Sequence, residues 1–300
     1  MVPAACPSTV AVPPFPVGPL SSKQPEPVTD IVQQLSYYAL FDVAEDVRWT
    51  MSSIPWDQIR TADVDANLIS LVRGAFHGEL TTYSATHGFM NLFKDDIDFT
   101  QWLSVWLYEE TKHPHALAKW LSLVGQPLSA SFFQEGRVIT PMTGSQVEML
   151  TFNIISEVVA AMNYTWTAKI TNEPVLKVIL HNLGKDEMRH SLGFEHYCRK
   201  LIRASADPDA ERIKCLRAAW AFLQSDQAIE HPVFMTANAI AAYTDADLVV
   251  KTRKMIRTQI TRRIAGVVEI DIPDPESVYQ VFRDLRGKHN AVKRVETATV

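Results

Sequence analysis

The chain has 300 residues, with 29 basic and 34 acidic side chains and a formal net charge of −5 at pH 7. Hydrophobic residues make up 47% and charged residues 21%, a balance typical of a soluble globular protein. The acidic balance argues against a nucleic-acid-binding protein, and no run approaches the roughly 18 apolar residues that a membrane-spanning helix needs.

The pattern along the chain predicts an all-α protein. Eight of the 17 prolines lie in residues 1–28, which predicts an extended or disordered arm ahead of a single helical domain over residues 29–300. Asp30 is a suitable N-cap for a helix over 31–47, and Asp63 or Asp65 for a helix that ends at Phe93. Further helices are expected at 99–124, 145–171, 174–202, 208–225, 234–243, 246–265 and 274–287.

Two compositional features refine this expectation. Only 11 residues are glycine, about half the average frequency of roughly 7%, which favours long helices joined by few turns. The three cysteines form neither a ligand cluster nor an even disulfide framework. A reducing compartment, the cytoplasm, is therefore expected.

Two of the predicted helices contain the motif Glu-x-x-His, at Glu110–His113 and at Glu187–His190. Residues three apart lie on one face of a helix, so each pair projects in one direction. The helix before each motif carries a glutamate among apolar residues, Glu79 in the first case and Glu157 in the second. A lone carboxylate in such a face costs several kcal/mol unless it is paired or binds a metal.

The spacing of these residues predicts one shared site. Glu79 precedes Glu110 by 31 residues, and Glu157 precedes Glu187 by 30. In an antiparallel helical hairpin, about 15 residues up and 15 back return the chain to the same height. Two such hairpins would place four carboxylates and two imidazoles at one level of a four-helix bundle. This is the ligand set of ferritin-like di-iron and di-manganese carboxylate proteins, and one imidazole per ion fits iron.

Four residues lie close in sequence to the candidate ligands, and each has an expected role or exposure. His77 is an alternative to Glu79, although it falls on a more polar face. Asp186 is expected to accept a hydrogen bond from a ligating imidazole. Glu109 is expected to be exposed, and Trp106 is expected to be a core residue first and an electron-transfer residue second.

The motifs resemble those of the soluble acyl-carrier-protein desaturases, a family of the ferritin-like di-iron superfamily. Residues 102–113 (WLSVWLYEETKH) are similar to the family's W-x-x-x-W-x-x-E-E-N-R-H helix, and residues 185–190 (KDEMRH) to its D-E-x-x-H helix. Trp49 and residues 54–56 (IPW) resemble its upstream tryptophan segment. Residues 79–83 (ELTTY) match its first ligand helix more loosely, and the local Leu-x-x-Tyr pattern aligns His77 with the family's glutamate.

The resemblance implies a set of roles. Glu79, Glu110 and His113 would serve one iron ion, and Glu157, Glu187 and His190 the other, with Glu110 and Glu187 bridging. Manganese is an alternative at one site. The resemblance also implies O₂ as co-substrate, a ferredoxin-type electron donor, an acyl chain on acyl carrier protein as substrate, and a homodimer.

Two departures keep the reaction open. The family has a threonine three residues after its third glutamate, where this chain has Ala160, so Asn163 or Thr165 would have to supply that polar group. The segment before the first ligand helix is shorter than in the family. Hydroxylation or N-oxygenation is therefore a rival to desaturation. Leu183 occupies the position of an additional histidine in the related N-oxygenases, which argues against them.

A basic segment is the candidate docking surface for an acidic carrier protein. Six bases and no acid occur over residues 251–263, and Met255, Ile256 and Ile260 predict a buried stripe that leaves these bases exposed. A solvated helix face is the alternative interpretation. The bases proposed for docking are Lys251, Arg253, Lys254 and Arg257, followed along the helix by Arg262 and Arg263.

Two other classes of function compete with an oxidoreductase. A ferritin-like protein could store or bind iron without an organic substrate, although storage ferritins are single bundles of about half this length. A purely structural bundle would carry the same glutamates and histidines on its surface and bind no iron.

Overall fold

The computed structural model describes residues 35–135, 144–224, 238–241 and 244–298. Within these ranges every element of regular secondary structure is a helix or a 3-10 turn, as the prediction of an all-α protein requires. The proline-rich arm and the Asp30 cap lie outside the described residues, and the helix expected at 234–243 falls on them only in part. Among the described residues, no helix is both long and apolar enough to cross a membrane.

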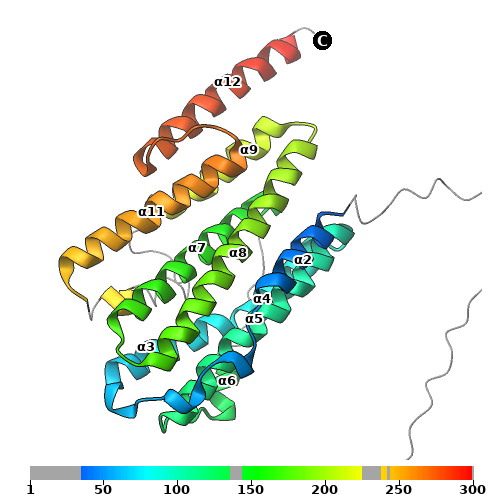
Figure 1. Cartoon of the computed structure of the whole chain (residues 1–300). Helices are drawn as coiled ribbons and strands as arrows, with labels where there is room; N and C mark the ends of the chain where they lie inside the picture. The colour runs from blue at the N-terminus through cyan, green and yellow to red at the C-terminus, as the bar shows by residue number, and fades with distance from the viewer. Residues whose placement is uncertain (1–34, 136–143, 225–237, 242–243, 299–300) are drawn as a thin grey trace, which may run out of the picture.

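The helices follow the predicted order closely (Figure 1). They are α2 (Ser36–Val47), α3 (Ala66–Leu80), α4 (Thr82–Leu92), α5 (Ile97–Leu123), α6 (Ala130–Glu135), α7 (Gln146–Ile170), α8 (Pro174–Ala204), α9 (Pro208–Gln224), α11 (Ala246–Val268) and α12 (Val278–Ala298), with short 3-10 turns at Met51–Ser53, Trp56–Gln58, Thr61–Asp63 and Pro275–Ser277.

The long helices begin at side-chain caps. Asp65 accepts a hydrogen bond from the Leu68 amide at the start of α3, so it is the cap of the two that the sequence offered. Ser145 and Glu148 form a capping box at the start of α7. Glu173 caps α8 ahead of Pro174, which occupies the first helical position.

The single helix predicted to end at Phe93 is two helices, which is a correction. The chain breaks at Thr81, directly after the last turn of α3, and continues as α4. The Thr81 hydroxyl donates to the Gly78 carbonyl and occupies an acceptor at the end of α3. Glu79 therefore lies in a helix terminus, next to the start of α4.

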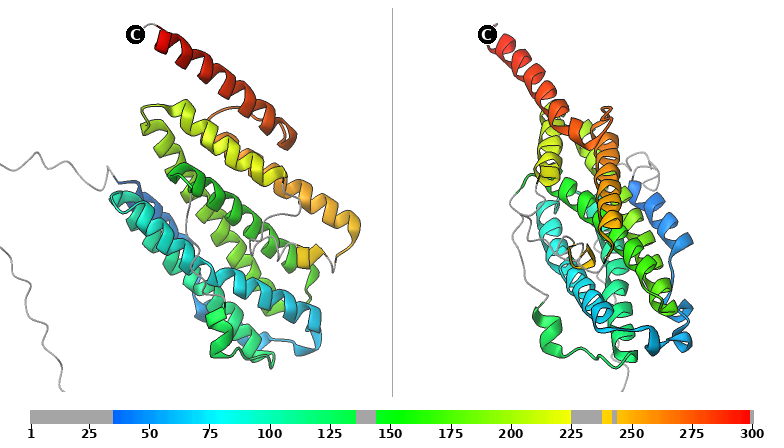
Figure 2. Two further views of the ribbon diagram at one scale, coloured as in Figure 1. Left: turned by 180° about the vertical axis from the view of Figure 1, so that it is seen from behind. Right: turned by 90° about the vertical axis from the view of Figure 1, so that its left-hand side faces the viewer.

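Four helices form the core bundle, α3, α5, α7 and α8, with α3–α5 and α7–α8 as the two hairpins (Figure 2). Helix α2 packs on α5. Helices α9 and α11 pack against α7 and α8 on the other side, and α12 lies against α9 as an outer helix.

Two apolar clusters divide the interior of the bundle. One cluster contains the aromatic residues before Glu110 on α5, among them Trp102 and Trp106, together with Phe194 on α8. The other contains Leu117 and Trp120, which follow His113 on α5, and the first turns of α8. The polar residues of the two motifs lie between these clusters, which flank them along the bundle.

Gly193 on α8 permits one close approach in this core. A Cβ atom placed there would come 2.1 Å from Trp102 Cζ2, so any larger residue would push the α5 tryptophan away. The glycine thus fixes the packing distance between α5 and α8 beside His190.

Candidate metal centre

The structure brings six sequence-predicted residues together at one level of the bundle. They form two groups of ligand atoms, each lying within 4.8 Å of one another. The first group is Glu79, Glu110, His113 and Glu187, and the second is Glu110, Glu157, Glu187 and His190. Glu110 and Glu187 belong to both groups. All six side chains are buried.

The two imidazoles face the carboxylates with the same ring nitrogen. His113 Nδ1 lies 3.2 Å from Glu187 Oε1 and 3.3 Å from Glu79 Oε2. His190 Nδ1 lies 2.9 Å from Glu110 Oε1 and 3.3 Å from Glu187 Oε2. The Glu-x-x-His spacing produces this arrangement because both members of each pair point inward from one helical turn.

Burial sets the protonation chemistry of the cluster. It raises the pKa of Glu79 to about 7, although the neighbouring His113 acts in the opposite direction. Burial and the nearby charge of Glu187 raise the pKa of Glu157 well above its usual range. For Glu110, the two histidines outweigh the effect of burial and hold its pKa well below the usual value.

This donor set fits a pair of hard metal ions. Four carboxylates concentrate negative charge in a buried space, and at neutral pH their mutual repulsion is relieved only by protons or by cations. Oxygen donors with one imidazole per group suit iron or manganese better than a soft, thiolate-binding ion. The residues present therefore fit a dinuclear metal centre.

The second ring nitrogen of each imidazole, Nε2, lies next to a further carboxylate. His113 Nε2 lies 3.3 Å from Asp186 Oδ2, in the position expected from the sequence. Trp49 Nε1 donates to the same oxygen at 2.7 Å. Burial alone would raise the pKa of Asp186, but the hydrogen bond and charge of His113 outweigh it and hold that pKa far below its usual value. Asp186 thus remains an anion that orients the ring.

Glu109 occupies the equivalent position for His190, which corrects the expectation that it is exposed. Its side chain is buried, with 2% of the residue exposed, and its Oε2 lies 3.2 Å from His190 Nε2. Arg189 links the two outer carboxylates, because its Nη2 donates to Glu109 Oε1 at 2.6 Å and to Asp186 Oδ1 at 2.8 Å. Arg189 is not among the residues predicted from the sequence, although its spacing of three residues from Asp186 places the two side chains on one face of α8.

His77 lies outside both groups of ligand atoms. Its ring packs at a tilt of 31° against Phe132, with 4.0 Å between the ring centroids, and it lies next to Phe76. The sequence left Glu79 and His77 as alternative ligands on the first helix. The structure places Glu79 in the cluster.

A threonine hydroxyl from another helix reaches the glutamate cluster. Thr82 on α4 donates from Oγ1 to Glu110 Oε2 at 3.2 Å. Thr165, one of the two expected substitutes, instead donates to the Ala161 carbonyl within its own helix. Asn163, the other expected substitute, lines the same cavity as Thr82. The break at Thr81 places Thr82 there, which the sequence did not reveal.

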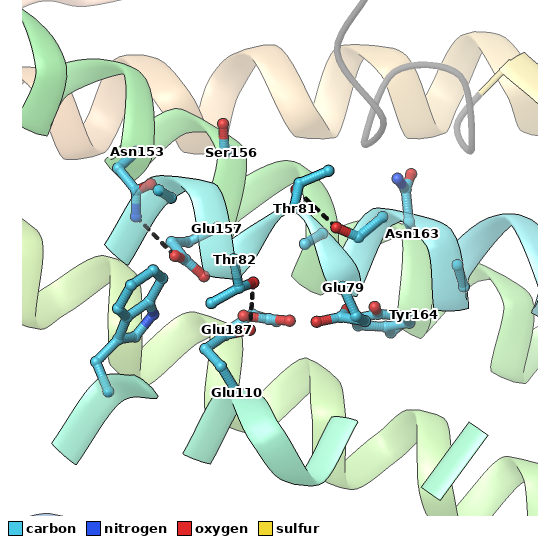
Figure 3. Close-up of a pocket in the computed structure, with 15 residues that line it drawn as sticks. Glu79, Thr81, Thr82, Glu110, Asn153, Ser156, Glu157, Asn163, Tyr164 and Glu187 are labelled. Atoms are coloured by element: carbon cyan, nitrogen blue, oxygen red, sulfur yellow. Dashed lines mark hydrogen bonds between the residues drawn. The ribbon is translucent and has the colours of Figure 1, made fainter. Parts of the chain in front are cut away.

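A cavity of about 90 Å³ opens beside the four glutamates (Figure 3). Its walls come from α3, α4, α5, α7 and α8. Trp106 lines it, and the Trp106 ring stands edge-on to His190 with 6.4 Å between the ring centroids. Trp106 is thus both a buried core residue and a neighbour of a candidate ligand. Asn153 donates to Glu157 Oε1 at 2.7 Å from the same wall.

The basic helix α11 is only partly as expected. Lys251, Arg253 and Lys254 are exposed, but Arg257 donates to the Leu223 carbonyl at 2.6 Å and Arg263 pairs with Glu195 at 3.3 Å. These two bases are half-buried because α9 and α8 present acceptors to them. Met255, expected in the buried stripe, is 47% exposed, whereas Ile256 and Ile260 are buried.

Comparison with known proteins identifies the fold. No protein-family model matches the chain, and no curated protein matches it. Among solved structures, it is similar to the putative acyl-ACP desaturase DesA2 from Mycobacterium tuberculosis H37Rv, with a TM-score of 0.52 and 18% sequence identity over 81% of this chain and 95% of that chain. The predicted fold class is therefore confirmed: the chain has the ferritin-like, all-helical fold of that protein.

Proposed function

We propose that this protein is an O₂-dependent non-haem di-iron oxidoreductase that acts on an acyl group carried by acyl carrier protein. The observation that supports the proposal most strongly is the pair of buried ligand groups that share Glu110 and Glu187. The additional helices α9, α11 and α12 outside the four-helix core favour an enzyme over a storage ferritin, which is a single bundle.

The ligand roles follow from the two groups. Glu79 and His113 would hold one ion, Glu157 and His190 the other, and Glu110 and Glu187 would lie between them. Manganese is the alternative at one position. When bound in the reduced state, the two iron ions supply electrons to O₂ and so make it able to remove hydrogen from an unactivated carbon.

The remaining residues position and insulate this centre. Asp186 and Glu109 accept from the outer nitrogens of the two imidazoles, so that each ring presents Nδ1 to its ion. The two apolar clusters flank this layer of the bundle, and the cavity gives access to it at the four glutamates. Thr82 holds one oxygen of Glu110 at the cavity wall.

We propose desaturation as the reaction. One O₂, two electrons and two protons would combine with the two hydrogen atoms removed from adjacent carbons, giving a carbon–carbon double bond and two waters. A ferredoxin-type protein would deliver the two electrons one at a time. The similarity of the fold to a putative acyl-ACP desaturase and the matching motifs support this choice over oxygen insertion.

The exposed bases of α11 are the proposed docking surface for the carrier protein. Helix α11 packs against α7, which carries Asn153, Ser156 and Glu157 of the cavity wall. Reversing the charge of Lys251, Arg253 and Lys254 is expected to raise KM for an acidic carrier without changing kcat. Reversal of Arg286, Lys288 and Arg294, three exposed bases on α12, provides a charge-matched control.

Single-turnover product analysis tests the proposal. The iron-loaded protein is reduced and mixed with O₂ and acyl carrier protein bearing chains of several lengths, and the acyl products are weighed by mass spectrometry. Loss of two hydrogen atoms supports desaturation, and gain of one oxygen atom identifies a hydroxylase. Continued iron uptake and mineralisation with no altered acyl group would identify a storage protein instead. Light scattering of the same sample tests the proposed homodimer.

A further inference from the structure

One guanidinium nitrogen of Arg189 is shared by two buried carboxylates from different helices. Its Nη2 donates to Glu109 Oε1 on α5 at 2.6 Å and to Asp186 Oδ1 on its own helix, α8, at 2.8 Å. The Arg189 side chain is itself mostly buried, with 18% of it exposed. An arginine keeps its charge throughout the pH range of proteins. A permanent cation therefore lies between the two carboxylates.

Each of these carboxylates uses its second oxygen to contact a candidate ligand imidazole. Asp186 Oδ2 lies 3.3 Å from His113 Nε2, and Glu109 Oε2 lies 3.2 Å from His190 Nε2. An unbroken chain of contacts thus runs from one imidazole through Asp186, Arg189 and Glu109 to the other. It joins the two rings at Nε2, whereas both Nδ1 atoms face the four glutamates.

The two carboxylates depend on Arg189 to different degrees. Asp186 Oδ2 also accepts from Trp49 Nε1 at 2.7 Å, and Lys112 Nζ lies 3.8 Å from the same oxygen. Among the described residues, no lysine and no other arginine forms an ion pair with Glu109. A buried carboxylate without a cation is strongly disfavoured, so it moves or changes its partner. Loss of Arg189 would therefore displace Glu109 more than Asp186.

We infer that Arg189 is a positioning residue common to both metal sites, which holds Glu109 and Asp186 so that both imidazoles keep Nδ1 toward the glutamates. This inference rests on the proposed function and adds to its centre a residue that contacts neither ion. Because one cation serves both carboxylates, a change at Arg189 reaches both sites at once, and the site of His190 more strongly. An arginine that only fastened α5 to α8 would stabilise the fold without this difference between the sites.

Proton NMR of the cobalt-loaded protein tests the inference. Co²⁺ follows Fe²⁺ in the affinity series for such donors, and it shifts the Nε2–H proton of a ligand imidazole away from the ordinary protein signals. One exchangeable signal is expected from each imidazole, and saturation transfer from water measures its exchange rate. Asp186→Asn weakens the acceptor of His113 and so identifies its signal. Glu109→Gln does the same for His190.

Arg189→Met removes every donor and keeps a long side chain. It is expected to speed the exchange of both signals, more for His190 than for His113, and to weaken binding of the ion at His190 by about 10–100-fold. Arg199→Met is the matched control, because Arg199 also ties α8 to another helix, with its Nε donating to the Gly266 carbonyl of α11 at 2.9 Å. The control is expected to leave both signals and both affinities unchanged.

A double-mutant cycle shows whether Arg189 acts through Glu109. Once Glu109→Ala has removed the carboxylate, Arg189→Met is expected to cause no further loss of affinity at the site of His190. Losses that simply add would mean that Arg189 acts on this site by another route, and would overturn the inference.

The outcomes separate this inference from the proposed function. Metal content is measured first, and wild-type protein that binds neither iron nor cobalt overturns both. Protein that binds two ions but shows the same two exchange rates in the wild type and in Arg189→Met overturns the role of Arg189 and leaves the di-iron proposal standing. If Arg189→Met does not fold, Arg189→Lys decides, because it keeps the charge on a shorter side chain. Unchanged exchange at both imidazoles in that variant would equally overturn the role.

Discussion

Glu110 of the first Glu-x-x-His motif contacts His190 of the second, with 2.9 Å between Glu110 Oε1 and His190 Nδ1. The two residues lie on α5 and α8, in different hairpins of the bundle. Neither motif forms a complete group of ligand atoms alone, because each group needs a carboxylate from the opposite hairpin. The packing of α5 against α8, fixed at Gly193 and Trp102, is therefore a condition for the centre.

Replacing Glu157 by glutamine should stabilise the metal-free protein, because folding then no longer requires an ionised carboxylate to take up a proton. Glu157 is buried, and burial together with the charge of Glu187 disfavours its ionised form. Glu157→Gln keeps its shape and is expected to raise the Tm of the metal-free protein by roughly 1–2 °C, the shift that about 1 kcal/mol produces at about 2.1 cal/mol/K per residue over a chain of this length. Thermal unfolding followed by circular dichroism measures it. Glu276→Gln, which removes an exposed carboxylate, should leave Tm unchanged, and a fall in Tm for Glu157→Gln would contradict the account.

Glu109 should support metal binding without contacting the metal. Its carboxylate accepts from His190 Nε2 and so fixes the ring that presents Nδ1. Glu109→Ala is expected to weaken iron binding by about 10–100-fold, the usual effect of losing such a partner. Competition with a chelator of known affinity measures the change. Glu276→Ala, at an exposed carboxylate, provides the control. Equal iron affinity in the two variants would show that Glu109 does not support metal binding through His190.

Thr82 should affect the reaction of the reduced centre with O₂. Its hydroxyl donates to Glu110 Oε2, whereas the hydroxyl of the adjacent Thr81 donates to the Gly78 carbonyl. Thr82→Val is expected to slow reoxidation of the reduced iron protein by about tenfold. Thr81→Val, of the same size and in the same wall, is expected to change it less than about twofold. Stopped-flow absorbance gives both rates, and the reverse order would exclude the role assigned to Thr82.

Asp98 should make stability depend on pH. It accepts from the Tyr37 amide at 2.7 Å and from Lys200 Nζ at 2.6 Å, which ties α2 and α8 to α5. Burial alone would raise its pKa, but these hydrogen bonds outweigh it and lower the pKa below its usual 3.8. A carboxyl with a lowered pKa in the folded state stabilises the protein above about pH 3.8, and that contribution is lost as pH falls through the lower folded value.

Asp98→Asn is therefore expected to reduce the free energy of unfolding by about 1.5–3 kcal/mol at pH 7, the range for hydrogen bonds to a charged group. The loss should shrink as pH falls below about 3.8. Urea unfolding at pH 7 and at a pH below about 3.8 measures the loss of stability. The control variant is Asp95→Asn, at an exposed carboxylate. A loss that stays constant with pH would rule out the ionised Asp98 as its source.

The sequence predicted the features that depend on spacing within a helix. The two Glu-x-x-His motifs, the matched separations to Glu79 and Glu157, and the cap at Asp65 are local patterns that the fold preserves. Residues about 30 apart meet because hairpins of straight helices return the chain to the same height.

The features that it missed depend on contacts between helices. Glu109 projects from a different side of α5 than Glu110, so the pattern of α5 alone does not predict that it is buried. It is buried because His190 of α8 packs against it. Arg257 and Arg263 resemble exposed bases until Leu223 and Glu195 are seen beside them. The helix breaks at Thr81, where the hydroxyl bonds to the Gly78 carbonyl at the end of α3. Thr82, the next residue, then contacts Glu110 of α5.

Iron content per chain in a set of ligand variants tests the central claim most directly. The wild-type protein, loaded anaerobically with ferrous iron and freed of excess metal, is expected to hold about two ions per chain. Because Glu110 and Glu187 belong to both ligand groups, Glu110→Ala or Glu187→Ala should lose nearly all iron, whereas Glu79→Ala or Glu157→Ala should keep about one ion. Far fewer than two ions in the wild type, unchanged by any of these substitutions, would contradict the account.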